Sequence, residues 1–272
     1  MNEQRFDIMV YTPLEKSVAE ADNKTGDYSK EKKKEFFDDF DSKSDYWSYR
    51  TNGMSDITYE NSVIKLFMGP TEALYYSNAE IADGDFTHLP WEPCNLETKV
   101  RLLGNHFGSA GWGFWNYSMT VDGSVPIWFI YLRTNSPKYP LNGFYVQVGN
   151  TFTPIKYFNK PPLSLKIATK LLKGLIPVKF TTTSPVMQNM DLSEWHTYKM
   201  LKENNNLVFY IDDNKISTIK IPTSKYGFRA DAWIDNAVFT PLKGDYARVY
   251  RHITHENREK AALEIDYIKI WL

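Results

Sequence analysis

Apolar and polar side chains alternate over short stretches of the chain from residue 36 onward, and clusters of Gly, Pro, Asn and Asp separate these stretches. Alternation with a period of two is typical of strands that bury one face, and such clusters are typical of turns. The pattern therefore predicts β-structure with strands at 57–68, 96–102, 111–115, 127–133, 144–148, 196–202, 207–211, 216–221 and 263–271.

Two turns within this pattern predict a β-meander. Three asparagines at 204–206 separate two of the predicted strands, and Asp213 and Asn214 separate the next pair. Asn and Asp tolerate the positive φ angles that tight hairpins require. The three strands between 196 and 221 are therefore expected to be neighbours in one sheet.

The rest of the pattern predicts one domain with an extension. Leu165, Ala168, Leu172 and Leu175 recur every three or four residues, which indicates a short amphipathic helix. Residues 1–35 are dense in Lys, Asp and Glu and predict a charged N-terminal extension, partly helical or mobile. An all-β chain of this length can form one domain, which is expected to cover residues 36–272.

Charge and composition exclude several classes of function. The formal net charge of -1 provides no positive electrostatic field that would attract nucleic acid. No apolar run approaches the roughly 18 residues of a membrane span, so a soluble protein is expected. The single cysteine, Cys94, excludes an internal disulfide and is expected to be a buried, inert thiol. The first residues lack a signal-peptide core, which predicts a cytoplasmic location by default; a secreted protein whose signal had been removed would have the same sequence. The sequence does not indicate an oligomeric state.

Several motifs occur in the order that one superfamily uses. They are Phe-Phe-Asp-Asp-Phe-Asp at 36–41 with Tyr46 and Trp47, Ser-Ala-Gly-Trp-Gly-Phe-Trp-Asn at 109–116, and the segments 194–198, 209–212, 232–236 and 263–270. Residues 36–272 thus resemble the concanavalin-A-like lectin/glucanase superfamily, in particular the laminarinase-like domains of family-sixteen glycoside hydrolases. The resemblance implies an all-β, antiparallel two-sheet jelly-roll β-sandwich with one or two short helices. It also implies a carbohydrate cleft on the concave sheet, with a polysaccharide or glycan as partner.

The catalytic motif of that family is missing from its expected strand. Retaining glucanases of the family carry Glu-x-Asp-x-x-Glu on the strand that follows the glycine-rich one, but residues 125–133 contain no acid. A Glu-x-Asp pair, Glu264 with Asp266, falls in the terminal strand and is expected to be structural. If the protein is an enzyme, Asp235 and Glu194 are the expected catalytic carboxylates. Other acids near strand ends have no diagnostic spacing: Asp122, Asp212 and Asp231.

Aromatic and polar residues of the motifs are candidates for sugar binding. Sugar rings have apolar faces that indole and phenol rings cover, while amides, carboxylates and guanidinium groups satisfy the hydroxyls. Because strand neighbours point to opposite faces, about half of the aromatic candidates should lie in the core. The ring candidates are Trp112, Trp115, Trp128, Tyr131 and Trp233, and the polar candidates are Asn116, Arg133, Asp235 and Asn236.

Evidence for a metal or cofactor is confined to one pair of acids. Related proteins tie the first and last strands together with Ca²⁺, and Asp39 and Asp266 are the residues that could hold it here. The five histidines do not have metal-ligand spacing, and no glycine-rich phosphate loop precedes a helix. No other cofactor is expected.

Three functions follow from these patterns. The first is non-catalytic glycan binding on the concave face. The alternative is a glycoside hydrolase or lyase with carboxylates in non-standard positions, and the second alternative is a structural or interaction β-sandwich without a sugar ligand.

Overall fold

The computed structural model describes residues 35–71, 75–84, 89–116, 125–136, 141–159, 178–224, 227–238 and 253–272. All of them belong to one compact unit, Lys32–Leu272. The described residues form strands and loops without an α-helix, so this part of the chain has no helix that could cross a membrane. The predicted helix at 162–175, and all but the last residue of the predicted extension, lie outside the described residues.

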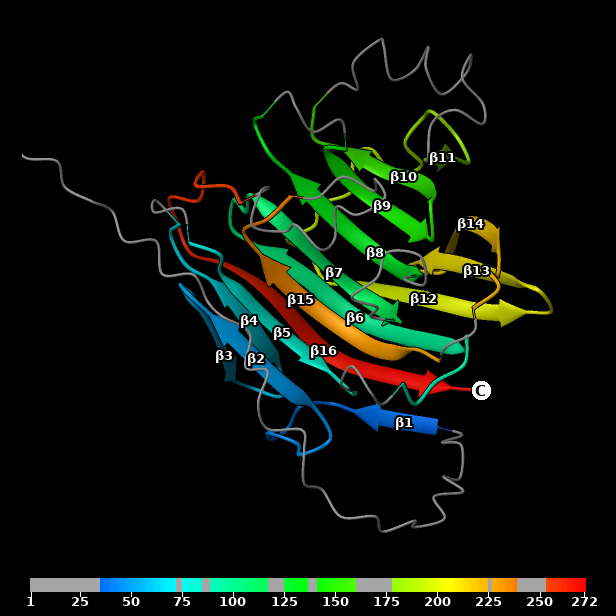
Figure 1. The fold of residues 1–272 in the computed structure, drawn as a ribbon, viewed down its shortest axis with the longest axis horizontal. Helices are drawn as coiled ribbons and strands as arrows, with labels where there is room; N and C mark the ends of the chain where they lie inside the picture. Colours follow the sequence, from blue (N-terminus) through cyan, green and yellow to red (C-terminus); the bar gives the residue numbers. More distant parts are fainter. Residues whose placement is uncertain are drawn as a thin grey trace, which may run out of the picture. The chain divides into compact units, whose positions relative to one another are not determined.

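The first sheet has eight strands in the order β14-β13-β12-β6-β16-β4-β3, and β1 pairs with β16 (Figure 1). All its pairs are antiparallel. Its strands are β1 (Glu35–Asp38), β3 (Ser55–Tyr59), β4 (Ile64–Met68), β6 (Asn95–Leu103), β12 (His196–Glu203), β13 (Asn206–Ile211), β14 (Asn214–Lys220) and β16 (Ala261–Trp271).

The second sheet also has eight strands, in the order β11-β10-β9-β8-β7-β15-β5-β2. Its pairs are antiparallel except for the short parallel contact of β11 with β10. Its strands are β2 (Ser48–Asn52), β5 (Asn78–Ala82), β7 (Gly108–Trp115), β8 (Pro126–Arg133), β9 (Gly143–Val148), β10 (Thr151–Tyr157), β11 (Lys179–Phe180) and β15 (Arg229–Asp235).

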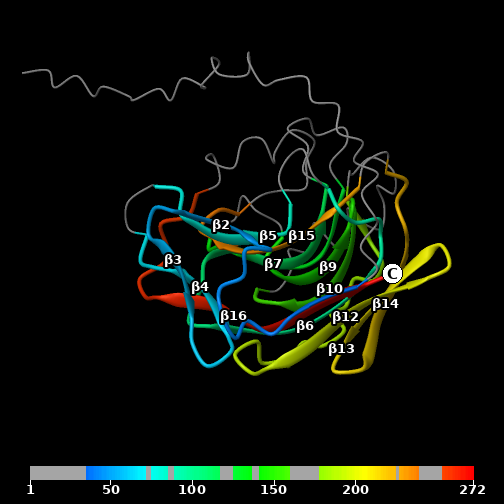
Figure 2. The same ribbon diagram turned by 90° about the horizontal axis from the view of Figure 1, so that it is seen from below.

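The two sheets lie face to face, as Figure 2 shows from their edges, and the main hydrophobic core fills the space between them. Phe129 of the second sheet packs against Tyr198 and Phe209 of the first, with ring centroids 5.0 and 5.6 Å apart. Each large ring of this kind removes apolar surface from water and contributes roughly 1.5–3 kcal/mol. In the central strands of both sheets, alternate residues point into this core and the residues between them point to the opposite face.

The architecture confirms the predicted all-β, two-sheet sandwich, but the predicted strands do not include β2, β5, β10 or β11, and one predicted strand is wrong. The single strand predicted at 57–68 is a hairpin of β3 and β4. Its turn is closed by hydrogen bonds of 3.0 and 3.1 Å between the backbones of Glu60 and Val63, and Asn61 and Ser62 have positive φ. The predicted β-meander is present as β12, β13 and β14.

Candidate functional site

The face of the second sheet that turns away from the first sheet, here called the outer face, carries the chemical groups of interest. Strand alternation defines it: Phe129 of β8 points into the core between the sheets, whereas Trp128 and Ile130 belong to a separate hydrophobic cluster on the outer face. On β15 the core residues alternate with four outer-face residues, which are Arg229, Asp231, Trp233 and Asp235.

Three tryptophans form a row on the outer face. Trp115, Trp128 and Trp233 come from β7, β8 and β15, and the ring centroids are 5.6 Å apart in the first pair and 4.6 Å apart in the second. Trp128 Nε1 donates to Gln147 Oε1 at 2.8 Å, and Trp233 Nε1 donates to the Ser109 hydroxyl at 3.0 Å. Trp128 and Trp233 are buried, but Trp115 remains partly exposed. The row therefore offers one accessible ring supported by two fixed ones.

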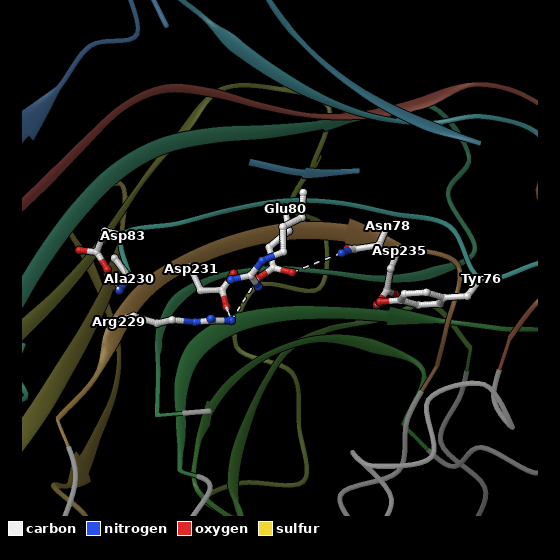
Figure 3. A network of polar contacts seen from close by, with 9 residues as sticks. Tyr76, Asn78, Glu80, Asp83, Arg229, Ala230, Asp231 and Asp235 are labelled. Atoms are coloured by element: carbon white, nitrogen blue, oxygen red, sulfur yellow. Dashed lines mark hydrogen bonds and ion pairs between the residues drawn. The ribbon is translucent and has the colours of Figure 1, made fainter. Parts of the chain in front are cut away.

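The same face carries a charged cluster, which Figure 3 shows from close by. Arg229 Nη2 lies 3.0 Å from both Glu80 Oε1 and Asp231 Oδ2. Arg50 Nη1 approaches Glu80 Oε1 to 2.6 Å, and Asn78 Nδ2 donates to Glu80 Oε2 at 3.3 Å. The cluster thus joins β2, β5 and β15 through two guanidinium groups and two carboxylates.

Asp231 is bonded through only one of its two carboxyl oxygens. Its side chain is only 2% exposed, and its Oδ1 atom has no hydrogen-bond partner. Burial raises its pKa to about 7, the negative charge of Glu80 adds to the rise, and Arg229 partly opposes it. Asp231 can therefore carry a proton near neutral pH, unlike an ordinary aspartate.

Asp235, at the other end of β15, is buried but fully hydrogen-bonded. Its Oδ1 accepts from the Ser109 hydroxyl at 2.8 Å and from the backbone N–H of Ala237 at 3.1 Å. Its Oδ2 accepts from Tyr76 Oη at 3.2 Å. Burial nevertheless raises its pKa to about 7, because these bonds offset only part of the lost solvation.

Asp83 anchors the strands that present the cluster. Its Oδ1 accepts from the backbone N–H of Ala230 at 2.7 Å, and its Oδ2 accepts from Tyr46 Oη at 2.8 Å and from Trp91 Nε1. Because Ala230 stands between Arg229 and Asp231, this carboxylate fixes the backbone of β15 where the charged cluster begins (Figure 3).

The structure separates the predicted sugar-binding residues into three groups. Trp115, Trp128, Trp233 and Asp235 lie together on the outer face. Trp112 and Tyr131 point into the core between the sheets, where the Trp112 ring contacts Tyr198 at 4.7 Å. The others lie at strand ends.

These strand-end residues have structural contacts. Asn116 accepts from the backbone N–H of Val125, and the Asn236 side chain bonds the backbones of Ser77 and Tyr75, both at 2.8 Å. The Arg133 guanidinium stacks over the rings of Phe107 and Phe158, at 4.6 and 5.6 Å. Each of these groups ties one loop or strand end to another.

The predicted catalytic pair is not brought together. Asp235 faces outward from the second sheet, whereas Glu194 is exposed in the turn that precedes β12 of the first sheet. On β8 the outer-face residues are all apolar, namely Trp128, Ile130 and Leu132. The terminal Glu-x-Asp pair is held by cations: Glu264 binds Arg101 at 2.6 Å and Lys65 at 3.5 Å, and Asp266 binds Lys99 at 2.7 Å.

The residues predicted to hold calcium have protein partners in the structure. Asp39 Oδ1 lies 3.5 Å from the backbone N–H of Asp41, and Asp266 is paired with Lys99. Asp38, the residue before Asp39, is not singled out by the sequence; its carboxylate accepts a hydrogen bond from Trp47 Nε1 at 2.8 Å. Among the described residues, no three acids, histidines or cysteines are grouped as a metal site would require. The calcium site stays a prediction.

Sequence reasoning missed most of the charged cluster: Arg50, Glu80 and Arg229, and the connection of Asp231 to them. A signal was present in residues 229–235, where charged or aromatic side chains alternate strictly with Ala and Ile. Such alternation predicts a polar group on one face of a strand. The partners on β2 and β5 could not be identified from it.

Comparisons with known proteins place the fold. No protein-family model and no curated protein matches the chain. Among solved structures, one described with endo-acting O-glycanases that human gut microbiota express to initiate mucin breakdown matches with a TM-score of 0.54 at 15% identity, over 87% of this chain and 98% of that chain.

Two further structures match over similar lengths. A family-sixteen glycoside hydrolase, an endo-glucanase from Bacteroides ovatus, has a TM-score of 0.51 at 15% identity, covering 86% of this chain and 99% of its own. A β-1,3-glucanase from Mycobacterium marinum has a TM-score of 0.51 at 13% identity, covering 87% and 97%. The chain therefore has the concanavalin-A-like jelly roll of these glucanases, as its motifs predicted.

Proposed function

We propose that the protein binds a polysaccharide or glycan on the outer face of its second sheet, without the family's usual catalytic motif. The observation that carries this proposal is the tryptophan row beside the charged cluster. Trp115 is partly exposed, and the Arg229 guanidinium lies 5.7 Å from its ring centroid. One face thus combines a stacking ring with groups that bond hydroxyls, which is the combination that a sugar ring requires.

The buried tryptophans support this role by holding Trp115 in place. Trp128 packs against Trp115 on one side and against Trp233 on the other. A ring that is already fixed loses little conformational entropy when a ligand stacks on it, so a larger share of the contact energy appears as affinity. The similarity to structures named as glucanases and as glycanases that break down mucin adds support, as a fold-level analogy.

The test is affinity electrophoresis in gels that contain soluble polysaccharides, preceded by a glycan array to choose them. Trp115→Ala is expected to weaken binding about tenfold, the equivalent of one good aromatic contact. Trp271→Ala is the matched control, because Trp271 is also partly exposed but belongs to β16 of the first sheet. Equal retardation of both variants and the wild type would contradict binding at Trp115. If no polysaccharide retards the protein and no glycan on the array binds it, the alternative of a structural or interaction β-sandwich without a sugar ligand is favoured.

A second candidate function, glycoside hydrolysis with carboxylates away from β8, is favoured by one observation. Glu80 and Asp231 each place an oxygen 3.0 Å from the same Arg229 nitrogen, so their carboxyl groups lie close together. Retaining glycosidases use two carboxyl groups about 5 Å apart, of which one donates a proton. With its pKa raised to about 7, Asp231 could be the donor.

Reducing-sugar release, followed in the same polysaccharide samples, tests this second candidate. If the pair is catalytic, release occurs with the wild type and falls at least a hundredfold in both Glu80→Gln and Asp231→Asn. Retardation without release would reject hydrolysis and leave the binding function intact. Release that persists in both variants would reject this pair as the source of the activity.

A further inference from the structure

The acids Glu80, Asp231 and Asp235 of the outer face differ in how many of their carboxyl oxygens have a partner. Both oxygens of Glu80 have partners, Oε1 in the two arginines and Oε2 in Asn78, and both oxygens of Asp235 have partners too. Asp231 is satisfied only at Oδ2, by Arg229, and its buried Oδ1 has none. Leaving such an oxygen unsatisfied destabilises the folded protein, and a hydrogen-bond donor of a ligand would remove that penalty.

The residues paired with Asp231 on the two neighbouring strands carry no long side chain, although the Trp128 ring reaches across β7 to Trp233. The register partner of Asp231 on β7 is Gly113 and its register partner on β5 is Ala82, so the smallest side chains flank it on both sides. The next outer-face pair along the same two strands is Arg229 with Trp115. The unsatisfied oxygen is therefore one residue pair away from the proposed stacking ring.

We propose that Asp231 Oδ1 is the point at which the protein recognises a hydroxyl group of an uncharged sugar residue. This inference rests on the proposed glycan binding and adds to it the residue that determines specificity and the class of glycan. The sugar ring stacks on Trp115, and a hydroxyl on the same residue or on the next one donates to Asp231.

The charges of the cluster favour an uncharged sugar. Arg50 and Arg229 already form ion pairs with Glu80 and Asp231, so each guanidinium group has a carboxyl partner. A uronate or sulfate group at Oδ1 would face two carboxyl groups, and an ammonium group would face Arg229 at close range. Like charges at such distances disfavour binding. A neutral hydroxyl donor meets neither penalty.

Asp231→Asn tests the inference with little change in volume. Because Arg229 Nη2 is a donor, it holds the amide oxygen of the new side chain, and the amide N–H₂ then takes the place of Oδ1. The acceptor of the ionised carboxylate is thereby replaced by a donor. A neutral β-glucan should retard the Asp231→Asn variant with an affinity at least tenfold weaker than for the wild type. An anionic polysaccharide such as alginate should retard the wild type no more strongly than the neutral β-glucan does.

Glu264→Gln is the matched control. Glu264 is also a buried carboxylate held by an arginine, but it lies on the far side of the first sheet. Its variant should bind the neutral glucan within twofold of the wild type, and thermal unfolding should show that both variants fold. Equal binding by wild type and Asp231→Asn, or preferential binding of alginate, would overturn this inference while glycan binding stands. Absence of retardation of the wild type by any polysaccharide would instead reject the proposed function.

Discussion

The indole rings of Trp128 and Trp233 meet 4.6 Å apart above a strand to which neither belongs. That strand is β7, which lies between β8 and β15, and its glycines make the contact possible. A Cβ atom at Gly111 would come within 2.4 Å of the Trp233 ring, and one at Gly113 within 2.7 Å of Trp128 Cβ. The glycine-rich motif thus creates the space in which the two rings lie.

Gly111→Ala is therefore expected to displace Trp233 and to lower the free energy of unfolding by about 1–3 kcal/mol, as overpacking does. Near-ultraviolet circular dichroism should show the altered tryptophan environment, and urea unfolding should show the loss of stability. Gly149→Asn is the control: Gly149 has a positive φ that Asn tolerates, and nothing lies within 4 Å of its added Cβ. A Gly111→Ala variant with unchanged spectrum and stability would refute the packing described here.

Arg229→Met should destabilise the protein more strongly. The substitution removes the cation that Glu80 and Asp231 share and leaves the buried carboxyl group of Asp231 without its ion-pair partner, while Glu80 keeps Arg50. Removing one partner of a buried ion pair typically costs about 3–5 kcal/mol. Urea unfolding monitored by tryptophan fluorescence would measure the loss.

The exposed pair of Lys269 with Glu35 provides the comparison for that experiment. Lys269→Met is expected to cost less than about 1 kcal/mol, because solvent screens a surface pair. Similar losses in the two variants would mean that the Arg229 cluster is no more important for stability than a surface ion pair.

The stability of the protein should fall as the pH rises toward neutrality. The pKa of Asp235 is raised from 3.8 to about 7 by burial, so the folded state binds this proton more tightly than the unfolded state. The resulting contribution to stability is complete below about pH 4 and is lost as the pH rises through 7. Burial lowers the pKa of His106 to about 4, so the contribution of His106 to stability increases as the pH rises from 4 to 6.5.

Comparison with Asp235→Asn separates these two effects, because the variant lacks the titrating carboxyl and retains His106. Between pH 5 and pH 8, the free energy of unfolding of the wild type should decrease relative to that of the variant. Parallel pH profiles for the two proteins would show that the carboxyl group of Asp235 has an ordinary pKa in the folded state.

Cys94 should be unreactive in the folded protein. The side chain is buried and its pKa is raised well above the ordinary value by loss of solvation, so neither access nor thiolate is available. A colorimetric thiol reagent at pH 8 should titrate no thiol in the native protein and one per chain in urea. Rapid reaction under native conditions would contradict the burial of this residue.

The sequence predicts the sandwich because a strand that buries one face has an apolar residue at every second position. This alternation can be recognised without knowing which strands pair. It does not separate β3 from β4, since the turn between Glu60 and Val63 contains neither Gly nor Pro, and its only signal is the run of three polar residues at 60–62. The hairpin turns of the meander are predictable because Asn204 and Asp213 adopt the positive φ that their residue types favour.

The site is only partly predictable for a related reason. Trp115, Trp128 and Trp233 could be selected because each belongs to a recognisable motif. The charged cluster depends on the register between β5 and β15, whose residues Glu80 and Arg229 are 149 positions apart. Local patterns contain no information about such pairing, so neither the ion pairs nor the unsatisfied oxygen of Asp231 could be foreseen.

The position of β16 has a consequence for how the protein is made. This strand pairs with β6 and β4, and its last residues pair with β1. A ribosome synthesises it after every other described strand, so the first sheet lacks its central member until residue 271 has been translated. Until then, β15 and the strands beside it have no completed partner layer, and the apolar side chains of the nascent chain remain exposed. The sandwich therefore assembles only after this region has been translated, and a chaperone that shields apolar surface would be most useful before then.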